Sequence, residues 1–189
     1  MTTIYTIGHS TRPIGELIDL LSAQQVTQLV DIRRIPRSRH NPQYAQEALR
    51  ASLAHAGVAY AYSKALGGLR SSSPASRNTA SRHTASRNTA SRNNAWRNKS
   101  FRGYADYMQT REFRTGVEEL VELARTRTTA IMCAEAVPWR CHRSLVADAL
   151  LVRGLAVRDI INEGAPAEHS LTSFAVVDGM DITYPATGE

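Results

Sequence analysis

The sequence has 189 residues, of which 42% are hydrophobic and 21% are charged, and its formal net charge is +6. This length suffices for one domain with a buried core, and this composition excludes collagen-like, wholly disordered and disulfide-dense chains. No apolar run approaches the roughly 20 residues of a membrane-spanning helix, and no secretory leader is recognisable, so we expect a cytoplasmic protein without a membrane partner.

Short apolar runs alternate with amphipathic stretches along the chain. The predicted strands are residues 3–7, 26–32, 58–62, 129–133 and 155–161, and the predicted helices are residues 13–24, 41–57, 104–108, 112–125 and 141–153. This alternation is typical of βαβ units and predicts one three-layer α/β domain over residues 1–189, with a mostly parallel sheet of about five strands and helices on both faces. A small hairpin turning at Asp178-Gly179 is expected at the end.

The positive charge is concentrated between two of these elements. Residues 70–102 hold eight basic and no acidic residues, so the remainder has 15 basic against 17 acidic residues. From Ala75 the pentamer ASRNT recurs four times with small changes. A five-residue period fits neither helix nor strand, so we expect a solvated low-complexity loop at about residues 70–100. The loop is either a tolerated duplication or a basic arm for nucleic-acid phosphates.

Chemically versatile residues follow the ends of the predicted strands. His9 and Ser10 come after the first strand, Asp31 ends the second, and Cys133 ends the fourth. Carboxyl ends of parallel strands meet at one edge of a sheet, where ligands bind. The other candidates for that edge are Arg33, Ser38, Arg39, Gly67, Gly68, Arg102, Tyr104, Glu135, Arg140, Cys141, His142 and Arg143. The sequence therefore predicts an anion-binding and catalytic site there.

Five separate blocks resemble a known family. In order and at compatible spacing, the chain contains TIGHS, VDIRRIPRSR, LGG, FRGYADYM and MCAEAVPWRCHRSLVADAL, as the domain-of-unknown-function family 488 does. The resemblance covers most of residues 4–161, and the pentamer repeat departs from it as an expansion between LGG and FRGY. It implies an α/β fold and no particular reaction, so the chemistry has to be argued from side chains.

The block around the two cysteines holds most candidates. We expect Cys141, His142 and Arg143 in the first turn of a helix, where free N–H groups and the helix dipole favour an anion. Arg140 and Arg143 would add bidentate donors. Cys133 is either a nucleophile, activated as a thiolate by these cations, or a buried residue that ends a strand. Two cysteines are too few for a disulfide scaffold, and we expect both as thiols.

Proton transfer is assigned to His9, Asp31 or Glu135, with His142 as a further candidate. Asp31 and Arg33 alternate along a strand end, so they either bracket a ligand or form an ion pair. Of the ligand-binding candidates, Arg33, Arg39 and Arg143 are the expected anion ligands, and Tyr104 either stacks on a base or belongs to the core. The remaining histidines, His169 among them, receive no role.

Three functions stay open. The first is an enzyme, of hydrolase or transferase type, that binds a phosphate-bearing or nucleotide-like small anion at the strand ends. The second is a nucleic-acid-binding protein that uses the arginines and the basic loop. The third is a structural module or a metal-binding one, with Cys133, Cys141, His142 and His9 as the thiolate and imidazole ligands. The sequence predicts neither a cofactor nor an oligomeric state.

Overall fold

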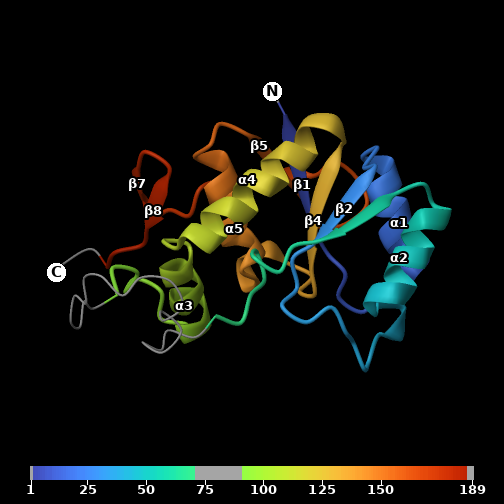
Figure 1. The fold of residues 1–189 in the computed structure, drawn as a ribbon, viewed down its shortest axis with the longest axis horizontal. Helices are drawn as coiled ribbons and strands as arrows, with labels where there is room; N and C mark the ends of the chain where they lie inside the picture. Colours follow the sequence, from blue (N-terminus) through green and yellow to red (C-terminus); the bar gives the residue numbers. More distant parts are fainter. Residues whose placement is uncertain (1, 71–90, 187–189) are drawn as a thin grey trace.

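The computed structural model describes residues 2–70 and 91–186 (Figure 1). Most of the pentamer repeat lies outside these ranges, and so does the expectation of a solvated loop there. Among the described helices, none is long and apolar enough to cross a membrane.

The fold is built on a six-stranded sheet with the order β3-β2-β4-β1-β5-β6. Its strands are β1 (Thr3–Gly8), β2 (Gln28–Asp31), β3 (Ala59–Tyr62), β4 (Thr129–Cys133), β5 (Ala156–Ile160) and β6 (Ala167–Glu168). The first five strands are parallel and coincide with the predicted segments, whereas β6 runs antiparallel to β5. The sixth strand was not expected, because two exposed residues carry no apolar alternation.

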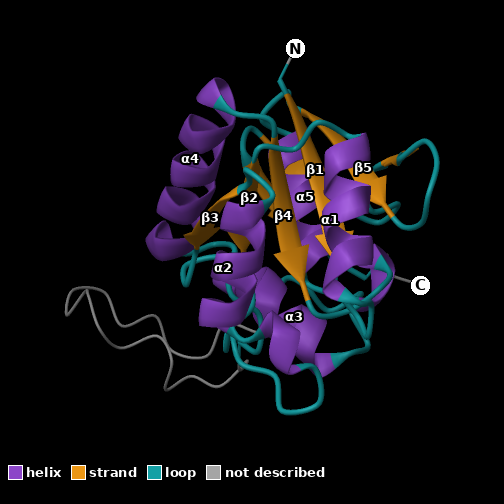
Figure 2. Ribbon diagram, turned by 90° about the vertical axis from the view of Figure 1, so that its right-hand side faces the viewer, coloured by secondary structure: helices purple, strands orange, loops and turns teal. Residues whose placement is uncertain are grey.

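Helices cover both faces of the sheet, which confirms the three-layer α/β fold (Figures 1 and 2). The helices that the structure describes are α1 (Ile14–Ala23), α2 (Gln46–His55), α3 (Lys99–Tyr107), α4 (Arg111–Thr126) and α5 (Arg143–Leu151), together with the short 3-10 helices η1 (Pro42–Tyr44) and η3 (Pro138–Arg140). Leucines of α1 and α2 pack on one face of the sheet, and apolar residues of α4 and α5 pack on the other.

The central strand β4 shows how the sequence produces two cores. All five of its residues are buried between β2 and β1. Ala130 and Met132 pack on the side of α1 and α2, whereas Ile131 and Cys133 pack on the side of α4 and α5. Because side chains alternate along a strand, a continuous apolar run is what a strand covered on both faces requires.

Three predicted helix starts differ from the structure. Helix α2 begins at Gln46, five residues after the predicted start at Asn41, because Pro42–Tyr44 form η1 and Ala45 then has extended backbone angles. Helix α5 begins at Arg143, because Cys141 has extended backbone angles after η3 and His142 is the cap. Helix α3 begins at Lys99, five residues before the predicted start, because the side chain of Asn98 accepts a hydrogen bond from the Ser100 amide and caps it.

The last copy of the pentamer repeat is partly built into the fold. Asn93 is only 1% exposed, its side-chain amide donates to Asp106, and its carbonyl oxygen accepts from the Tyr184 amide. Ser91 also donates to Asp106. The low-complexity loop predicted to extend to about residue 100 therefore ends earlier, because Ser91 and Asn93 serve as anchors.

The predicted C-terminal hairpin is present as β7 (Val176–Asp178) and β8 (Asp181–Thr183). Gly179 adopts a positive φ of 59° at its turn. Strand β8 and the residue after it reach the core, since Ile182 and Tyr184 are buried and the Tyr184 ring contacts Trp96 and Phe174.

Candidate functional site

The carboxyl ends of β1, β2 and β4 lie side by side. Gly8 pairs with Cys133, and Asp31 pairs with Met132. After these strands, the chain turns from β1 into α1 on one face and from β4 into α5 on the other. Such a divergence of neighbouring strands opens a crevice at the edge of a parallel sheet, as the sequence predicts.

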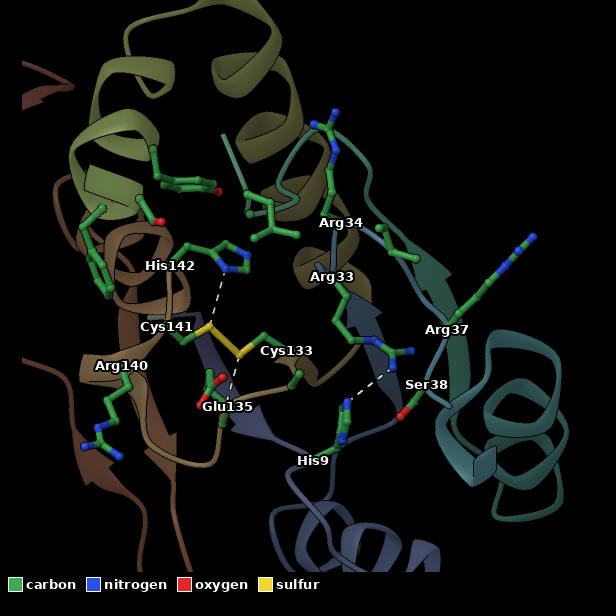
Figure 3. Close-up of a pocket in the computed structure, with 17 residues that line it drawn as sticks. His9, Arg33, Arg34, Arg37, Ser38, Cys133, Glu135, Arg140, Cys141 and His142 are labelled. Carbon is green, nitrogen blue, oxygen red and sulfur yellow. Dashed lines mark hydrogen bonds between the residues drawn. A yellow bond between two sulfur atoms is a disulfide. The ribbon is translucent and has the colours of Figure 1, made fainter. Parts of the chain in front are cut away.

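A pocket of about 340 Å³ occupies this edge (Figure 3). Of the predicted site residues, it is lined by His9, Arg33, Ser38, Gly68, Tyr104, Cys133, Glu135, Arg140, Cys141 and His142. Residues that the sequence did not single out complete the lining, namely Arg34, Ile35, Arg37, Leu69, Ser100, Phe101 and Ala134. The pocket therefore gathers segments that follow β1, β2, β3 and β4.

Cys133 and Cys141 are joined by a disulfide in the wall of this pocket (Figure 3). The expectation of two thiols is therefore corrected. Cys133 ends β4, and η3 returns the chain so that Cys141, eight residues later, faces it. Both cysteines also border the core, since Cys133 is 1% exposed and Cys141 5%.

Arg143 lies behind the disulfide and not in the pocket lining. Its side chain is fully buried, and its Nη1 donates to Cys133 Sγ at 3.0 Å and to the carbonyl of Glu135 at 2.9 Å. Its Nη2 donates to the carbonyl of Ala136, while Nε has no hydrogen-bond partner among the described residues. Burial lowers the pKa of Arg143 to about 10, so the group is still a cation at neutral pH.

No carboxylate forms an ion pair with Arg143 anywhere in residues 2–70 and 91–186, although this charge is removed from water. Buried charges are normally paired, because desolvation costs several kcal/mol. Backbone carbonyls supply only partial negative charge. The cation is thus placed against a sulfur atom with no formal counter-charge in contact.

His142 stands on the other side of the disulfide with its proton position fixed. Its Nε2 lies 3.0 Å from the carbonyl oxygen of Ile32, so Nε2 carries the hydrogen and donates it. Its Nδ1 then has a lone pair, and it lies 3.5 Å from Cys141 Sγ. Burial lowers the pKa of His142 to about 4, so the ring is neutral at physiological pH. A Cβ on Gly68 would come within 2.6 Å of Nδ1, so this glycine leaves room for the ring.

His9 is also a neutral ring at neutral pH. Its Nδ1 donates to the carbonyl of Ser10 at 2.8 Å, and its Nε2 accepts from Arg33 Nη1 at 3.3 Å. The ring stacks on Tyr44, and burial lowers the pKa of His9 to about 4. Both nitrogens of His9 therefore have protein partners.

Asp31 and Arg33 form an ion pair at 2.6 Å. Arg33 donates to Asp31 through Nε, Nη2 and its backbone amide, and Tyr60 donates its hydroxyl hydrogen to the same carboxylate. Asp31 is fully buried and is absent from the pocket lining, whereas Arg33 reaches the pocket next to His9. Of the two sequence interpretations of this pair, the geometry favours the ion pair.

Three arginines in the pocket wall have a different character. Arg34, Arg37 and Arg140 are exposed, and no ion pair joins their side chains to any residue that the structure describes. Among the described residues of the lining, Glu135 is the single carboxylate. With Arg33 neutralised by Asp31, the pocket keeps a net positive charge.

The other predicted ligand-binding residues lie outside the pocket. Arg39 is exposed, and Ser10 has a positive φ of 48° in the turn after β1. Gly67 packs against the backbone of Arg34, and Arg102 donates to the carbonyl of Trp96. Sequence position alone did not distinguish Arg39 from Arg34 and Arg37, because residues 34–40 form no regular element with a predictable direction.

Sequence reasoning gave His169 no role, yet its side chain connects two buried carboxylates of different elements. Its Nδ1 donates to Asp159 at 2.9 Å and its Nε2 to Asp148 at 3.3 Å. Burial opposes the charged ring, but the two carboxylates outweigh it and raise the pKa of His169 to about 9. Tyr184 also donates to Asp148, so the C-terminal segment is tied to α5 and β5. No local pattern marks these partners, which are 10 and 21 residues from His169.

Within the described ranges, no three His, Cys, Asp or Glu side chains gather as a metal site.

In comparisons with known proteins, the pattern of a family described as "Domain of unknown function DUF488" matches residues 13–150, which is well over half of the chain. No curated protein and no solved structure matches the sequence.

Proposed function

The chain belongs to the family described as "Domain of unknown function DUF488", and from the geometry of its pocket we propose that it is an enzyme acting on a small phosphate-bearing or nucleotide-like anion. The observation that carries this proposal is the excess of cationic groups in the wall. The lining contains Arg34, Arg37 and Arg140 against one described carboxylate, Glu135, and no ion pair joins these arginines to any described side chain.

The size and composition of the pocket support a small organic ligand. Its volume of about 340 Å³ falls at the lower end of the range for small-molecule sites. Arginine presents a planar fork of donors that matches phosphate and carboxylate oxygens. Ile35, Leu69 and Phe101 add apolar surface for the uncharged part of such a ligand.

The proposal is tested by thermal unfolding in the presence of inorganic phosphate, a nucleoside monophosphate and a sugar phosphate. A ligand at about 100 times its Kd should stabilise the fold by about 2.7 kcal/mol and raise the melting temperature by several degrees. The increase should be lost in Arg37→Gln and Arg140→Gln and kept in Arg50→Gln, which removes an exposed arginine of α2 outside the pocket. Equal increases in all three variants, or none with any ligand, would contradict the proposal.

A second candidate, nucleic-acid binding, is favoured by Trp139. This side chain is 65% exposed and directly precedes Arg140, so it offers a stacking surface beside a cation. Binding of a single-stranded oligonucleotide should then weaken with salt and with Trp139→Ala. A deletion that tests the basic repeat should remove residues 76–90 only, because Ser91 and Asn93 are anchored in the fold.

A further inference from the structure

Cys133 and Cys141 stand in two chemically different environments at one place. Cys133 Sγ accepts from the Arg143 guanidinium at 3.0 Å, and Cys141 Sγ lies 3.5 Å from the unprotonated Nδ1 of His142. Both sulfurs belong to the wall of the pocket, and Figure 3 shows the disulfide facing its interior. A disulfide that serves only to brace the fold needs neither a cation on one sulfur nor a base on the other.

A reduced Cys133 would explain why the charge of Arg143 is buried without a carboxylate partner among the described residues. Because no described carboxylate pairs with Arg143, a thiolate at Cys133 would supply the missing counter-charge at hydrogen-bond distance. The neutral His142 favours the protonated form of Cys141, since its Nδ1 accepts the thiol hydrogen while Nε2 remains on the Ile32 carbonyl. The Arg143 backbone amide also donates to Cys141 Sγ at 3.4 Å, but the charged guanidinium donates to Cys133 Sγ, so in the reduced protein the one remaining thiol proton belongs to Cys141.

We propose that Cys133 and Cys141 form a dithiol–disulfide couple that exchanges two electrons with a small disulfide carrying carboxylate or phosphate groups. The anionic part of this inference rests on the proposed function, because Arg34, Arg37 and Arg140 would hold the charged groups. The sulfur chemistry rests on Arg143 and His142 alone.

The exchange balances without another cofactor. The Cys133 thiolate attacks one sulfur of the bound disulfide, forming a mixed disulfide and releasing the first thiolate, which takes a proton from water. The Cys141 sulfur then attacks Cys133 Sγ while its proton passes to His142 Nδ1, which holds it only during the displacement because the pKa of the ring is low. The Cys133–Cys141 disulfide forms, and the second leaving thiolate takes the proton from His142. Two electrons pass to the substrate, and two molecules of a small thiol return them in the reverse steps.

The first experiment follows the full chain by intact mass. The protein is reduced with dithiothreitol, freed of reductant and mixed with glutathione disulfide, which carries carboxylates. The wild type should lose two hydrogens without a lasting adduct, and Cys141→Ser should keep one glutathione on Cys133. Cys133→Ser should form an adduct at Cys141 at least tenfold more slowly, at about the rate of a thiol without a cation. Equal rates in the two variants, or two thiols that persist in the wild type, would overturn the couple.

The second experiment measures how the adduct rate of Cys141→Ser depends on pH. A thiolate stabilised by Arg143 should give half of the maximal rate below the pH of about 8.5 that is typical of a free thiol. Adding Arg143→Lys should keep the half-point low, and adding Arg143→Gln should raise it. Should Arg143→Gln fail to fold, the profile of the Cys141→Ser protein itself decides, because a half-point at or above 8.5 contradicts the thiolate.

A third comparison separates this inference from the proposed function. Glutathione disulfide is replaced by the uncharged hydroxyethyl disulfide, and both reagents are tested on Arg140→Gln. We expect Arg140→Gln to react about fivefold more slowly than the wild type with glutathione disulfide and at the wild-type rate with hydroxyethyl disulfide, because the variant loses one exposed charge contact. If both reagents form the internal disulfide at rates that Arg140→Gln leaves unchanged, the couple stands and the anion site fails. If phosphate-bearing ligands bind but neither reagent produces the internal disulfide, the anion site stands and the couple fails.

Discussion

Asp31 and Arg33, two residues apart at the end of β2, form an ion pair that is almost completely removed from solvent, with side chains 0% and 6% exposed. Replacing Asp31 by Asn should lower the free energy of unfolding by about 3 kcal/mol, because a buried guanidinium then loses its counter-charge. Urea unfolding measures the change. Glu122→Gln is the control, since its pair with Arg125 is exposed and should contribute less than about 1 kcal/mol. Similar effects in both variants would show that Arg33 finds another partner.

His169 gives the fold a pH dependence of known sign. Its pKa rises from 6.5 to about 9 on folding, so its stabilising contribution is complete below pH 6.5 and is lost as the pH rises through 9. His169→Gln should remove about 2 kcal/mol at neutral pH, a typical value for hydrogen bonds to charged groups, and much less well above pH 9. Urea unfolding of the oxidised protein across this window measures the loss. The exposed His55 of α2 provides the control through His55→Gln, and a loss independent of pH would contradict the charged ring.

Gly8 leaves space for the segment that carries Glu135. A Cβ on Gly8 would overlap the carbonyl oxygen of Glu135 and come within 2.8 Å of Arg143 Nη1. Gly8→Ala should therefore displace this segment and cost about 2–3 kcal/mol of unfolding free energy, as overpacked sites do. Gly15→Ala is the matched change, since nothing lies within 4 Å of its Cβ and helix α1 should gain about 1 kcal/mol. Thermal unfolding of both variants should shift in opposite directions.

Asn93 anchors the end of the repeat, and removing its side chain should lower the free energy of unfolding. Asn93→Ala removes the hydrogen bonds to Asp106 and to the Tyr184 amide, which should cost about 2 kcal/mol. The neighbouring Asn94 is exposed and accepts one hydrogen bond, from the Ala186 amide, so Asn94→Ala should cost less than about 0.5 kcal/mol. Equal losses in urea unfolding would mean that burial of Asn93 does not matter.

The sequence predicted the layers well, because they follow from periodicity. The run over residues 129–133 is apolar at every position, as a strand buried on both faces must be, and the leucines of α1 recur at helical spacing. The sheet edge at which the pocket lies also followed, since parallel strands place their carboxyl ends together.

The roles of individual residues depend on contacts that no local pattern encodes. Arg143 was expected to bind an anion at a helix start, yet its side chain turns under the segment after β4 and contacts Cys133. His169 acquires its charge only because Asp148 and Asp159 meet it from other elements. Ser91 and Asn93 share their local sequence with the other copies of the repeat, so sequence could not single them out as anchors.

Backbone pairing between β1 and β4 continues past the strands into the pocket. The His9 amide donates to the carbonyl of Cys133 at 3.0 Å, and the Ser10 amide donates to that of Ala134 at 2.8 Å. The Cys133–Cys141 disulfide therefore lies on backbone that continues the pairing of the sheet. Arg34 and Arg37, in contrast, belong to a separate segment without regular structure. Substitutions at Arg34 and Arg37 can therefore change the charge of the pocket while the backbone pairing beneath the disulfide stays intact.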